Sequence, residues 1–333
     1  MKDKVLQILK KIGIVVFFPV ILVAWLVSCL VNLIVRLKNK KLVETPLGQF
    51  IEVDGHRMSI LVTGRGDHTI VFLPGLCRTC PILDFKPVFS RLEDQFRIVV
   101  PEKFGYGLSD IVKENRDFET IVEQYRKALS ILDIKPPYIL CAHSLSGHDV
   151  ELWAQKYPDE VEAFIGFDTN LSTCPEIDFN EKELKREAFE GWIYRTAGWT
   201  RFEGLYGLDK ALDKREVRII RELECRNTEN PCIQSEERNY LSAHRLIQSK
   251  PLPIMPTLQF VDAPEWYKNG VEEPHEPGDR DEELATWIKP HQEYVAASRH
   301  GKLIYRSRGH VMHHYDYVEM AGEIKAFIAE LWN

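Results

Sequence analysis

The most conspicuous hydropathy pattern is a long apolar run near the N-terminus. Residues 12–35, IGIVVFFPVILVAWLVSCLVNLIV, carry no charge, and only Ser28 and Asn32 are strongly polar. Twenty-four helical residues can cross a bilayer, and a buried core helix of this length would show a polar face. Pro19 is tolerated within such a span. We therefore expect a transmembrane helix at 12–35, after a short basic tail (1–11) and before a linker (36–48).

Beyond residue 48, short apolar runs alternate with amphipathic stretches. Residues 49–53 and 58–63 alternate around Asp54-Gly55, which predicts a hairpin. Continuous apolar runs predict buried strands at 69–73, 96–100, 163–167, 257–261 and 302–305. A further strand is predicted to begin at Tyr138. Helical patterns occupy 84–92, 118–132 and 316–331. Apolar strands separated by helices predict an α/β fold with a mostly parallel sheet covered on both faces.

Residues 171–253 interrupt this alternation and have a helical pattern throughout, dividing the core into residues 49–170 and 254–333. Aromatic residues are concentrated in one part of this segment. Two interpretations stay open: a stripe that seals the segment against the body, or a surface that faces an acyl chain or a membrane. The aromatic residues are Trp192, Tyr194, Trp199, Phe202 and Tyr206.

The charge is divided unevenly along the chain. The first 41 residues carry eight basic side chains and one acidic one, so the net charge of −7 leaves about −14 on the remainder, which argues against a nucleic-acid partner. Lysines flank the apolar run on both sides. Because a tail with four lysines is costly to translocate, we favour the N-terminus inside and the folded domain outside the cytoplasm.

Two other interpretations of the N-terminal run were weighed. A cleaved signal peptide is disfavoured because the run is too long and no small-residue cleavage site follows it. Residues 26–29, LVSC, resemble a bacterial lipoprotein cleavage box with Cys29 as the lipidated residue. However, residues 30–35 remain apolar, whereas a lipoprotein usually has a polar linker after the lipidated cysteine.

The cysteine count favours reduced thiols, because seven is odd and the spacing is irregular. This argues against the outward orientation. Cys77-x-x-Cys80 has no second pair at zinc-finger spacing and is not a metal site by itself. Cys225 and Cys232 could form a disulfide.

Residues 138–153, YILCAHSLSGHDVELW, predict a strand, a tight small-residue turn and a helix, with Ser144 at the apex. A strained turn of this kind lifts a serine hydroxyl clear of the sheet edge, and small neighbours let the helix pass close to the strand. Here those neighbours are Ala142, Ser146 and Gly147. The alternative is a surface serine that caps the following helix.

Four segments in the right order resemble the α/β-hydrolase fold family, of the AB hydrolase-1 type: FLPGL, PEKFGYGLSD, AHSLSG and SRGHVMHH. The resemblance covers residue 49 to the C-terminus. It implies an α/β-hydrolase fold in which residues 171–253 form a helical lid. It also implies that the backbone amides of Leu76 and Leu145 form an oxyanion hole. The chain departs from the family pattern at Pro74, Ala142 and Ser146, where many members have His, Gly and Gly.

A serine hydroxyl needs a base within hydrogen-bond reach. The resemblance selects His310, which lies between the last strand and the terminal helix. His313 and His314 fall on structural loop positions of the family, and we interpret His143 as a packing residue that points away from the site.

The third member of such a triad is a carboxylate, which the family places after strand six or strand seven. Asp168 ends strand six, and Asp262 and Glu265 follow strand seven. The usual glycine-containing turn and aspartate are missing after strand seven, so we choose Asp168 and keep Glu265 and Asp262 as alternatives.

The sequence therefore predicts a membrane-anchored serine hydrolase that cleaves an ester, thioester or small amide of a small-molecule or lipid-like acyl substrate through an acyl-enzyme. Neither a cofactor nor a metal is implied. A non-catalytic binding or sensor protein of the same fold is the alternative from another class. A cofactor-free perhydrolase or C–C hydrolase would use the same triad.

Overall fold

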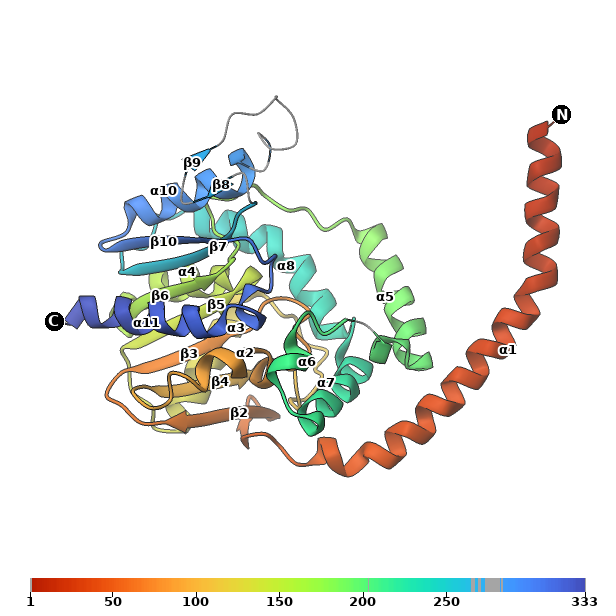
Figure 1. The fold of residues 1–333 in the computed structure, drawn as a ribbon, viewed down its shortest axis with the longest axis horizontal. Helices are drawn as coiled ribbons and strands as arrows, with labels where there is room; N and C mark the ends of the chain where they lie inside the picture. The colour runs from red at the N-terminus through yellow and green to blue at the C-terminus, as the bar shows by residue number, and fades with distance from the viewer. Residues whose placement is uncertain are drawn as a thin grey trace.

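The structure is a computed structural model, and it describes residues 2–202, 204–264, 267–268, 271–272, 282 and 284–332. At its centre is an eight-stranded sheet with the order β1-β2-β4-β3-β5-β6-β7-β10 (Figure 1). β2 pairs antiparallel with β1 and β4, and the other neighbours are parallel, as predicted. The strands are β1 (Gln49–Val53), β2 (His56–Gly64), β3 (Thr69–Leu73), β4 (Arg97–Glu102), β5 (Tyr138–His143), β6 (Val161–Phe167), β7 (Thr257–Asp262) and β10 (Gly301–Arg306). A separate two-stranded sheet joins β8 (Tyr267–Lys268) to β9 (Val271–Glu272).

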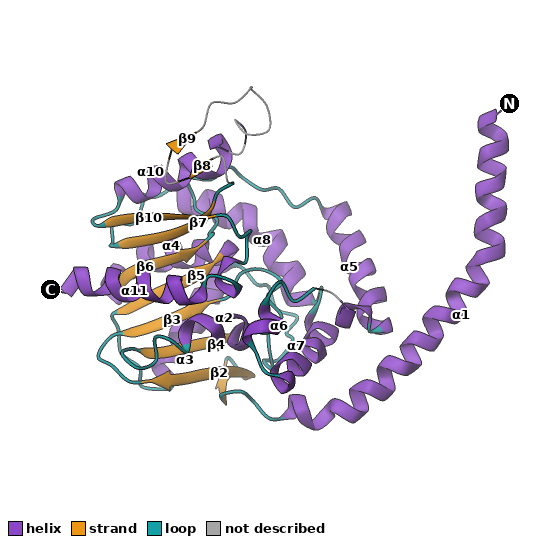
Figure 2. Cartoon of the chain, in the orientation of Figure 1, coloured by secondary structure: helices purple, strands orange, loops and turns teal. Residues whose placement is uncertain are grey.

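Helices cover both faces of the large sheet (Figures 1 and 2). Successive side chains of a strand point to opposite faces, so Ile70 and Phe72 of β3 join one apolar core and Val71 and Leu73 join the other. The first core includes side chains of α2 (Pro81–Phe89) and α11 (Tyr317–Trp332). The second includes those of α3 (Phe118–Ile131) and α4 (Gly147–Lys156). Both faces are apolar, which explains the continuous apolar runs in the sequence.

The chain between β6 and β7 is helical, as expected. Its helices are α5 (Glu181–Ala197), the 3₁₀ turn η3 (Trp199–Phe202), α6 (Leu208–Ala211), α7 (Lys214–Asn227) and α8 (Pro231–Gln248). We call residues 171–253 the lid segment. The remaining elements are the short turns η1 (Ser144–Ser146), η2 (Pro158–Glu160) and η5 (Met312–His314), the π-helical η4 (Leu284–Ile288) and α10 (Lys289–Ala297).

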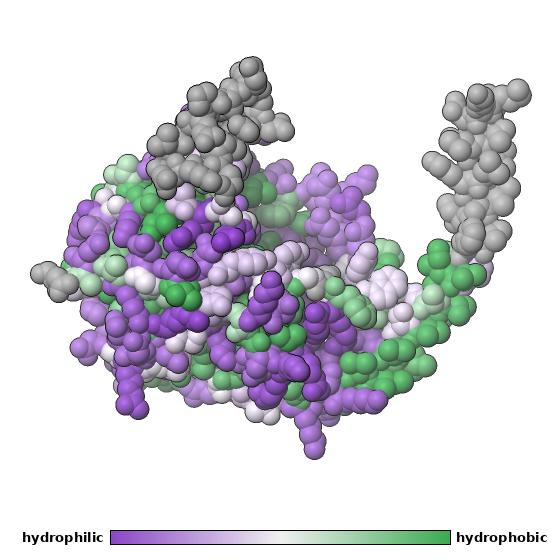
Figure 3. All heavy atoms as spheres, viewed as in Figure 1, coloured by the Kyte–Doolittle hydropathy of each residue, from purple (hydrophilic) through white to green (hydrophobic). Residues whose placement is uncertain are grey.

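The N-terminal helix α1 (Lys2–Glu44) is longer than predicted. Residues 36–44 of the expected linker continue it, because Arg, Lys, Leu and Glu are good helix formers. Residues 18–44 form a helix that is long and apolar enough to cross a membrane. A signal sequence can have the same length and composition. Most of its apolar side chains are exposed, so it is not a core helix. Figure 3 shows these hydrophobic residues, in green, along the arm that α1 forms beside the domain.

Polar contacts fasten α1 to the lid segment. Trp25 Nε1 donates to the Ile193 carbonyl at 3.3 Å, and Asn32 Nδ2 donates to the carbonyls of Arg195 and Thr196 at 3.1 and 3.0 Å. Asn32 Oδ1 in turn accepts from Arg201 Nη2 at 2.9 Å. The polar residue inside the apolar run is therefore buried against the lid.

The aromatic residues of the lid segment do not form a core stripe. Trp192, Tyr194, Phe202 and Tyr206 are exposed, and Phe202 has 85% of its surface accessible. Trp192 packs against Trp25 of α1, with ring centroids 5.7 Å apart. Of the two interpretations made from the sequence, sealing the segment against the body is wrong for these four side chains.

Candidate active site

The predicted turn at Ser144 is present between β5 and α4. Ser144 has a φ of 54°, which is strained for a residue with a side chain. Gly147 lies where the turn meets the chain after β6, and a Cβ there would be 2.2 Å from the Asn170 carbonyl oxygen. The close approach that we expected for a small residue is therefore made at Gly147. Ser146 instead donates from Oγ to the Pro74 carbonyl at 2.6 Å.

That hydrogen bond joins the turn to the loop after β3, which carries Leu76. Gly75 packs directly on the turn, because a Cβ at this position would lie 2.7 Å from Ser144 Cβ. Leu76 is the next residue, and Leu145 follows Ser144 in η1. The two residues expected to supply oxyanion-hole amides thus lie on the two segments that meet at Ser144.

The structure brings Ser144, His310 and Asp168 together. His310 Nε2 lies 2.8 Å from Ser144 Oγ, and His310 Nδ1 lies 2.6 Å from Asp168 Oδ2. Asp168 is buried, whereas 49% of the His310 side chain is exposed. Each side chain comes from the carboxyl-terminal end of a strand or from the loop that follows it: Ser144 after β5, Asp168 after β6 and His310 after β10.

Asp168 is itself held by two donors. Its Oδ1 accepts from the Asp262 backbone N–H at 2.8 Å and from Trp287 Nε1 at 2.9 Å. Oδ2 of Asp168 therefore remains available to accept a hydrogen bond from the imidazole of His310. Trp287 lies 119 residues away in the sequence, and no pattern there indicated this contact.

The alternative acid Asp262 has a different position. Its Oδ1 accepts from the backbone N–H groups of Arg308 and Gly309 at 3.1 and 2.8 Å, so it holds the loop that carries His310. Burial raises the pKa of Asp262, and the nearby Asp168 carboxylate raises it further. The other alternative, Glu265, lies outside the described residues.

His143 is buried, as expected of a packing residue, but the prediction that it points away from the site is wrong, because its ring packs 4.7 Å from that of His310 between centroids. Burial lowers the pKa of His143 well below its ordinary range, with His310 and His313 adding to the effect. The neutral ring donates from Nε2 to the His310 carbonyl at 2.9 Å. His143 therefore positions the backbone of His310, a role that the sequence did not indicate.

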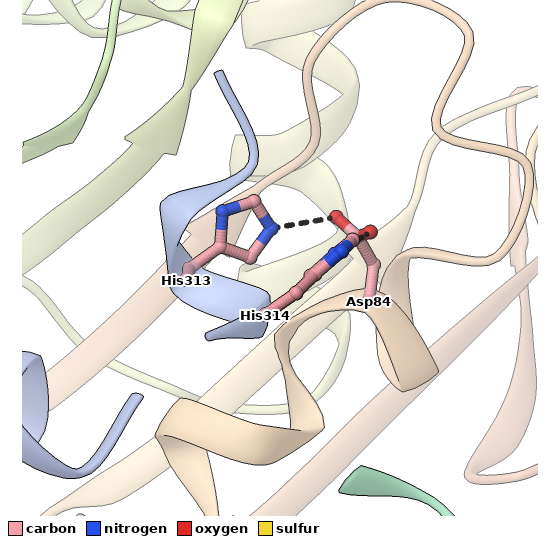
Figure 4. Close-up of side chains that lie close together, drawn as sticks. All are labelled: Asp84, His313 and His314. Atoms are coloured by element: carbon pink, nitrogen blue, oxygen red, sulfur yellow. Dashed lines mark hydrogen bonds and ion pairs between the residues drawn. The ribbon is translucent and has the colours of Figure 1, made fainter. Parts of the chain in front are cut away.

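His313 and His314 belong to a buried polar cluster with Asp84, shown in Figure 4. His313 Nε2 lies 3.3 Å from Asp84 Oδ2, and His314 Nε2 lies 2.8 Å from Asp84 Oδ1. Burial lowers the pKa of His313 to about 4, with His314 as the next cause. Through this cluster, η5 is tied to α2.

The same three side chains are arranged closely enough to be considered as metal ligands. The Arg78 guanidinium, however, already donates to Asp84, from Nε at 3.0 Å and from Nη2. His314 Nδ1 also faces the Tyr206 carbonyl of the lid segment, at 3.1 Å. A buried ion pair, and not a metal site, accounts for these contacts.

Every cysteine of the chain is free. The pairing considered for Cys225 and Cys232 is wrong: Cys225 Sγ contacts Thr200 Oγ1 at 3.1 Å, and Cys232 Sγ contacts the backbone of Val112.

Part of the chain is similar in sequence to known proteins. Residues 68–201 match the family model described as alpha/beta hydrolase fold. The uncharacterized protein YbdG of Bacillus subtilis (strain 168) is 40% identical over 124 residues, which cover 37% of this chain and 38% of that protein. The uncharacterized protein YqjL of the same organism is 27% identical over 123 residues, covering 37% and 48%. The matched stretch therefore spans less than half the length of either curated relative.

Solved structures share the fold over most of the chain. An esterase from Thermogutta terrifontis superposes with a TM-score of 0.61 at 16% identity, covering 86% of this chain and 100% of its own. An enol-lactonase from Burkholderia xenovorans LB400 gives 0.60 at 14% identity, covering 84% and 100%. An epoxide hydrolase from Vigna radiata gives 0.62 at 13% identity, covering 86% and 99%. Together with the eight-stranded sheet and the matched family model, these likenesses show that the chain has the alpha/beta hydrolase fold.

Proposed function

We propose that this alpha/beta hydrolase fold protein is a serine hydrolase that cleaves a carboxylic ester, thioester or small amide through an acyl-enzyme. The observation that carries the proposal is the contact of Ser144 Oγ with His310 Nε2, together with that of His310 Nδ1 with Asp168. A hydroxyl bonded to a neutral imidazole is the arrangement that acyl transfer needs.

In the first half of the reaction, Ser144 Oγ attacks the substrate carbonyl carbon while His310 Nε2 accepts the hydroxyl proton. Asp168 holds Nδ1–H of His310 and stabilises the imidazolium that forms. The backbone amides of Leu76 and Leu145 stabilise the oxyanion. His310 then returns the proton to the leaving alcohol, thiol or amine, and the acyl group stays on Ser144.

In the second half, water takes the place of the leaving group. His310 accepts a proton from the water, whose oxygen attacks the acyl carbon, and the acid is released as Ser144 regains its proton. The esterase and the lactonase among the structural neighbours act on carbonyl compounds by name, and this reaction belongs to the same class.

The direct test is labelling with a fluorophosphonate probe, read by intact mass. The wild-type chain should gain one adduct, and Ser144→Ala should gain none. Ser130→Ala, which removes an exposed hydroxyl from α3, is the matched control and should label normally. A wild-type chain that neither labels nor cleaves short esters would favour a non-catalytic binding protein.

We further propose that α1 anchors the protein in a membrane with the domain outside the cytoplasm. The support is the length of the apolar helix and the exposure of its side chains. Alkaline carbonate extraction should leave the full chain with the membranes. Protease added to intact cells should digest the domain, and protection of the domain would reverse the orientation.

A further inference from the structure

A second group of chemically active side chains lies next to the oxyanion loop. Cys77 follows Leu76, and its Sγ lies 3.8 Å from Glu229 Oε1 as a thiol donor. Glu229 precedes α8, and Glu237 lies within that helix. The thiol sulfur and one carboxylate oxygen of each glutamate all lie within 4.8 Å of one another. We refer to Cys77, Glu229 and Glu237 as the acidic subsite.

The neighbouring Glu236 forms an ion pair, whereas no ion pair of Glu229 or Glu237 is found in the part of the chain that the structure describes. Lys103 Nζ pairs with Glu236 at 2.7 Å. Glu237 is only 5% exposed, yet its Oε2 has no hydrogen-bond partner among the described residues. The same holds for Glu229 Oε2. A buried carboxylate oxygen without a partner is costly, so these two oxygens mark a place that a donor would fill.

The pKa values of the two glutamates also indicate that their charges are unmatched. Burial raises the pKa of Glu237 to about 8, and Glu229 and Glu187 add to the effect. Burial also raises the pKa of Glu229, with Glu187 next. The cations that oppose them have other partners: Arg195 Nη1 donates to the Thr228 carbonyl, and Arg238 pairs with Glu181. The cluster therefore carries an excess of negative charge once Glu237 is ionised.

Cys77 of the acidic subsite is close to the candidate nucleophile and is exposed. Gly75 packs on Ser144, and Cys77 lies two residues further along, so its Cα is within about 7.6 Å of the Gly75 Cα. Cys77 is exposed and lines a cavity of about 190 Å³ between the loop and residues 204–208 of the lid segment. The two glutamates do not line this cavity, so a substrate bound at Ser144 would approach them at Cys77, whose Sγ lies within 4.8 Å of an oxygen of each.

We propose that the acidic subsite binds a primary ammonium group of the substrate, so that the enzyme prefers esters or amides that carry a cation near the scissile carbonyl. An ammonium group has three donors, which suit the orphan oxygens of Glu229 and Glu237. Cys77 is a thiol donor to Glu229, whereas a metal would require the thiolate. This inference rests on the proposed hydrolase function and names its substrate class.

The test compares matched p-nitrophenyl esters with the full-length chain in detergent. Each ω-amino acyl ester, from glycyl to 6-aminohexanoyl, is paired with a neutral ester of equal chain length, and a second set places the ammonium group on the alcohol. The measured quantity is the ratio of kcat/KM for the cationic and the neutral member. Because a hydrogen bond to a charged group is involved, we expect a ratio of about 10 or more for at least one pair.

Two substitutions locate the preference. Glu237→Gln keeps the shape of the side chain and removes its charge, so the ratio of kcat/KM for the cationic and the neutral ester should fall towards 1. Glu229→Gln should act in the same direction. Glu190→Gln, an exposed change on the same lid with the same loss of charge, is the control and should leave the ratio unchanged. Thermal unfolding of each variant checks that the fold is kept.

For the 6-aminohexanoyl pair, whose ammonium group has a lysine-like pKa of about 10.4, the preference should also increase from pH 6 to pH 9, as Glu237 becomes ionised while the ammonium group remains charged. Ratios near 1 for all pairs, in a wild-type chain that labels with fluorophosphonate, would overturn the subsite and leave the hydrolase function intact. Stoichiometric Zn²⁺ binding that Glu237→Gln abolishes, without an amine preference, would also overturn it. Absence of both labelling and ester cleavage would instead refute the proposed function.

Discussion

The choice of Asp168 as the partner of His310 has the most specific consequence. Oδ1 of this carboxylate faces two donors, the Asp262 N–H and Trp287 Nε1, and Oδ2 faces His310 Nδ1. In Asp168→Asn, the amide oxygen should stay with the two donors, because the amide NH₂ cannot accept from them. The NH₂ group then faces His310 Nδ1.

An NH₂ donor at this position requires Nδ1 of His310 to be the acceptor. The ring proton then lies on Nε2 and points at Ser144 Oγ, so the imidazole cannot accept the serine proton. We expect kcat to fall by up to about 10⁴-fold, which is about 5.4 kcal/mol of barrier at 1.36 kcal/mol per decade. The side chain keeps its size and two of its hydrogen bonds, so the melting temperature should change little.

The assay is steady-state hydrolysis of a neutral p-nitrophenyl ester, together with the rate of fluorophosphonate labelling. Asp262 provides the control. Asp262→Asn keeps an oxygen that can accept from Gly309 and Arg308, so it should lower kcat by less than tenfold. If Asp168→Asn stays within tenfold of the wild type while Asp262→Asn loses its activity, the assignment of the acid is wrong and the roles of the two carboxylates are exchanged.

Four further predictions concern the nucleophile, the buried carboxylates and the anchor. Ser144→Ala should lower turnover by on the order of 10³-fold or more, and ester hydrolysis close to the wild-type rate would rule out the proposed mechanism. Asp84→Asn should cost about 3 kcal/mol in urea unfolding, because Arg78 loses its buried partner; an unchanged midpoint would contradict the ion pair. Burial raises the pKa of Glu151 from 4.5 to about 8, so the contribution of this group to stability is complete below pH 4.5 and is lost as the pH rises through 8. Glu151→Gln should therefore make the melting temperature depend less on pH between pH 6 and 9. A melting temperature that falls with pH as steeply as in the wild type would argue against this. Asn32→Ala should increase the rate at which the lid segment is cleaved by protease, since it removes four hydrogen bonds to the lid segment, and equal cleavage rates would show that α1 does not support it.

The sheet was predictable because its signals are local. A strand buried on both faces is apolar over most of its length, and β3 and β5 are apolar apart from Thr69 and His143 at their ends, so both strands were visible in the sequence. The turn at Ser144 was visible for a related reason: a strained apex between a strand and a helix needs small neighbours. α1 was found from its length and composition, but its end was placed nine residues early, because residues 36–44 are polar and yet helical.

The contacts that position the residues of the candidate site could not be predicted, because they join residues far apart in the sequence. Asp168 and Trp287 are separated by 119 residues, and His143 and His310 by 167. Asp262 was considered only as a catalytic acid, since a carboxylate at a strand end has the same sequence signature whether it holds an imidazole or two backbone amides. The aromatic side chains of the lid segment presented a similar ambiguity, which was resolved by their exposure next to α1.

The geometry of the candidate triad depends on polar contacts at its edges more than on the triad residues themselves. The loop bearing His310 is held by His143 at one carbonyl and by Asp262 at two amides, and the turn after it is held by Asp84. The loop after β3, which carries Leu76, is held by Ser146 in the same way. These contacts fix positions without touching the reacting atoms. Substitutions such as His143→Phe should therefore slow turnover while Ser144 still reacts with fluorophosphonate, because the hydroxyl and its base remain and only their alignment is relaxed.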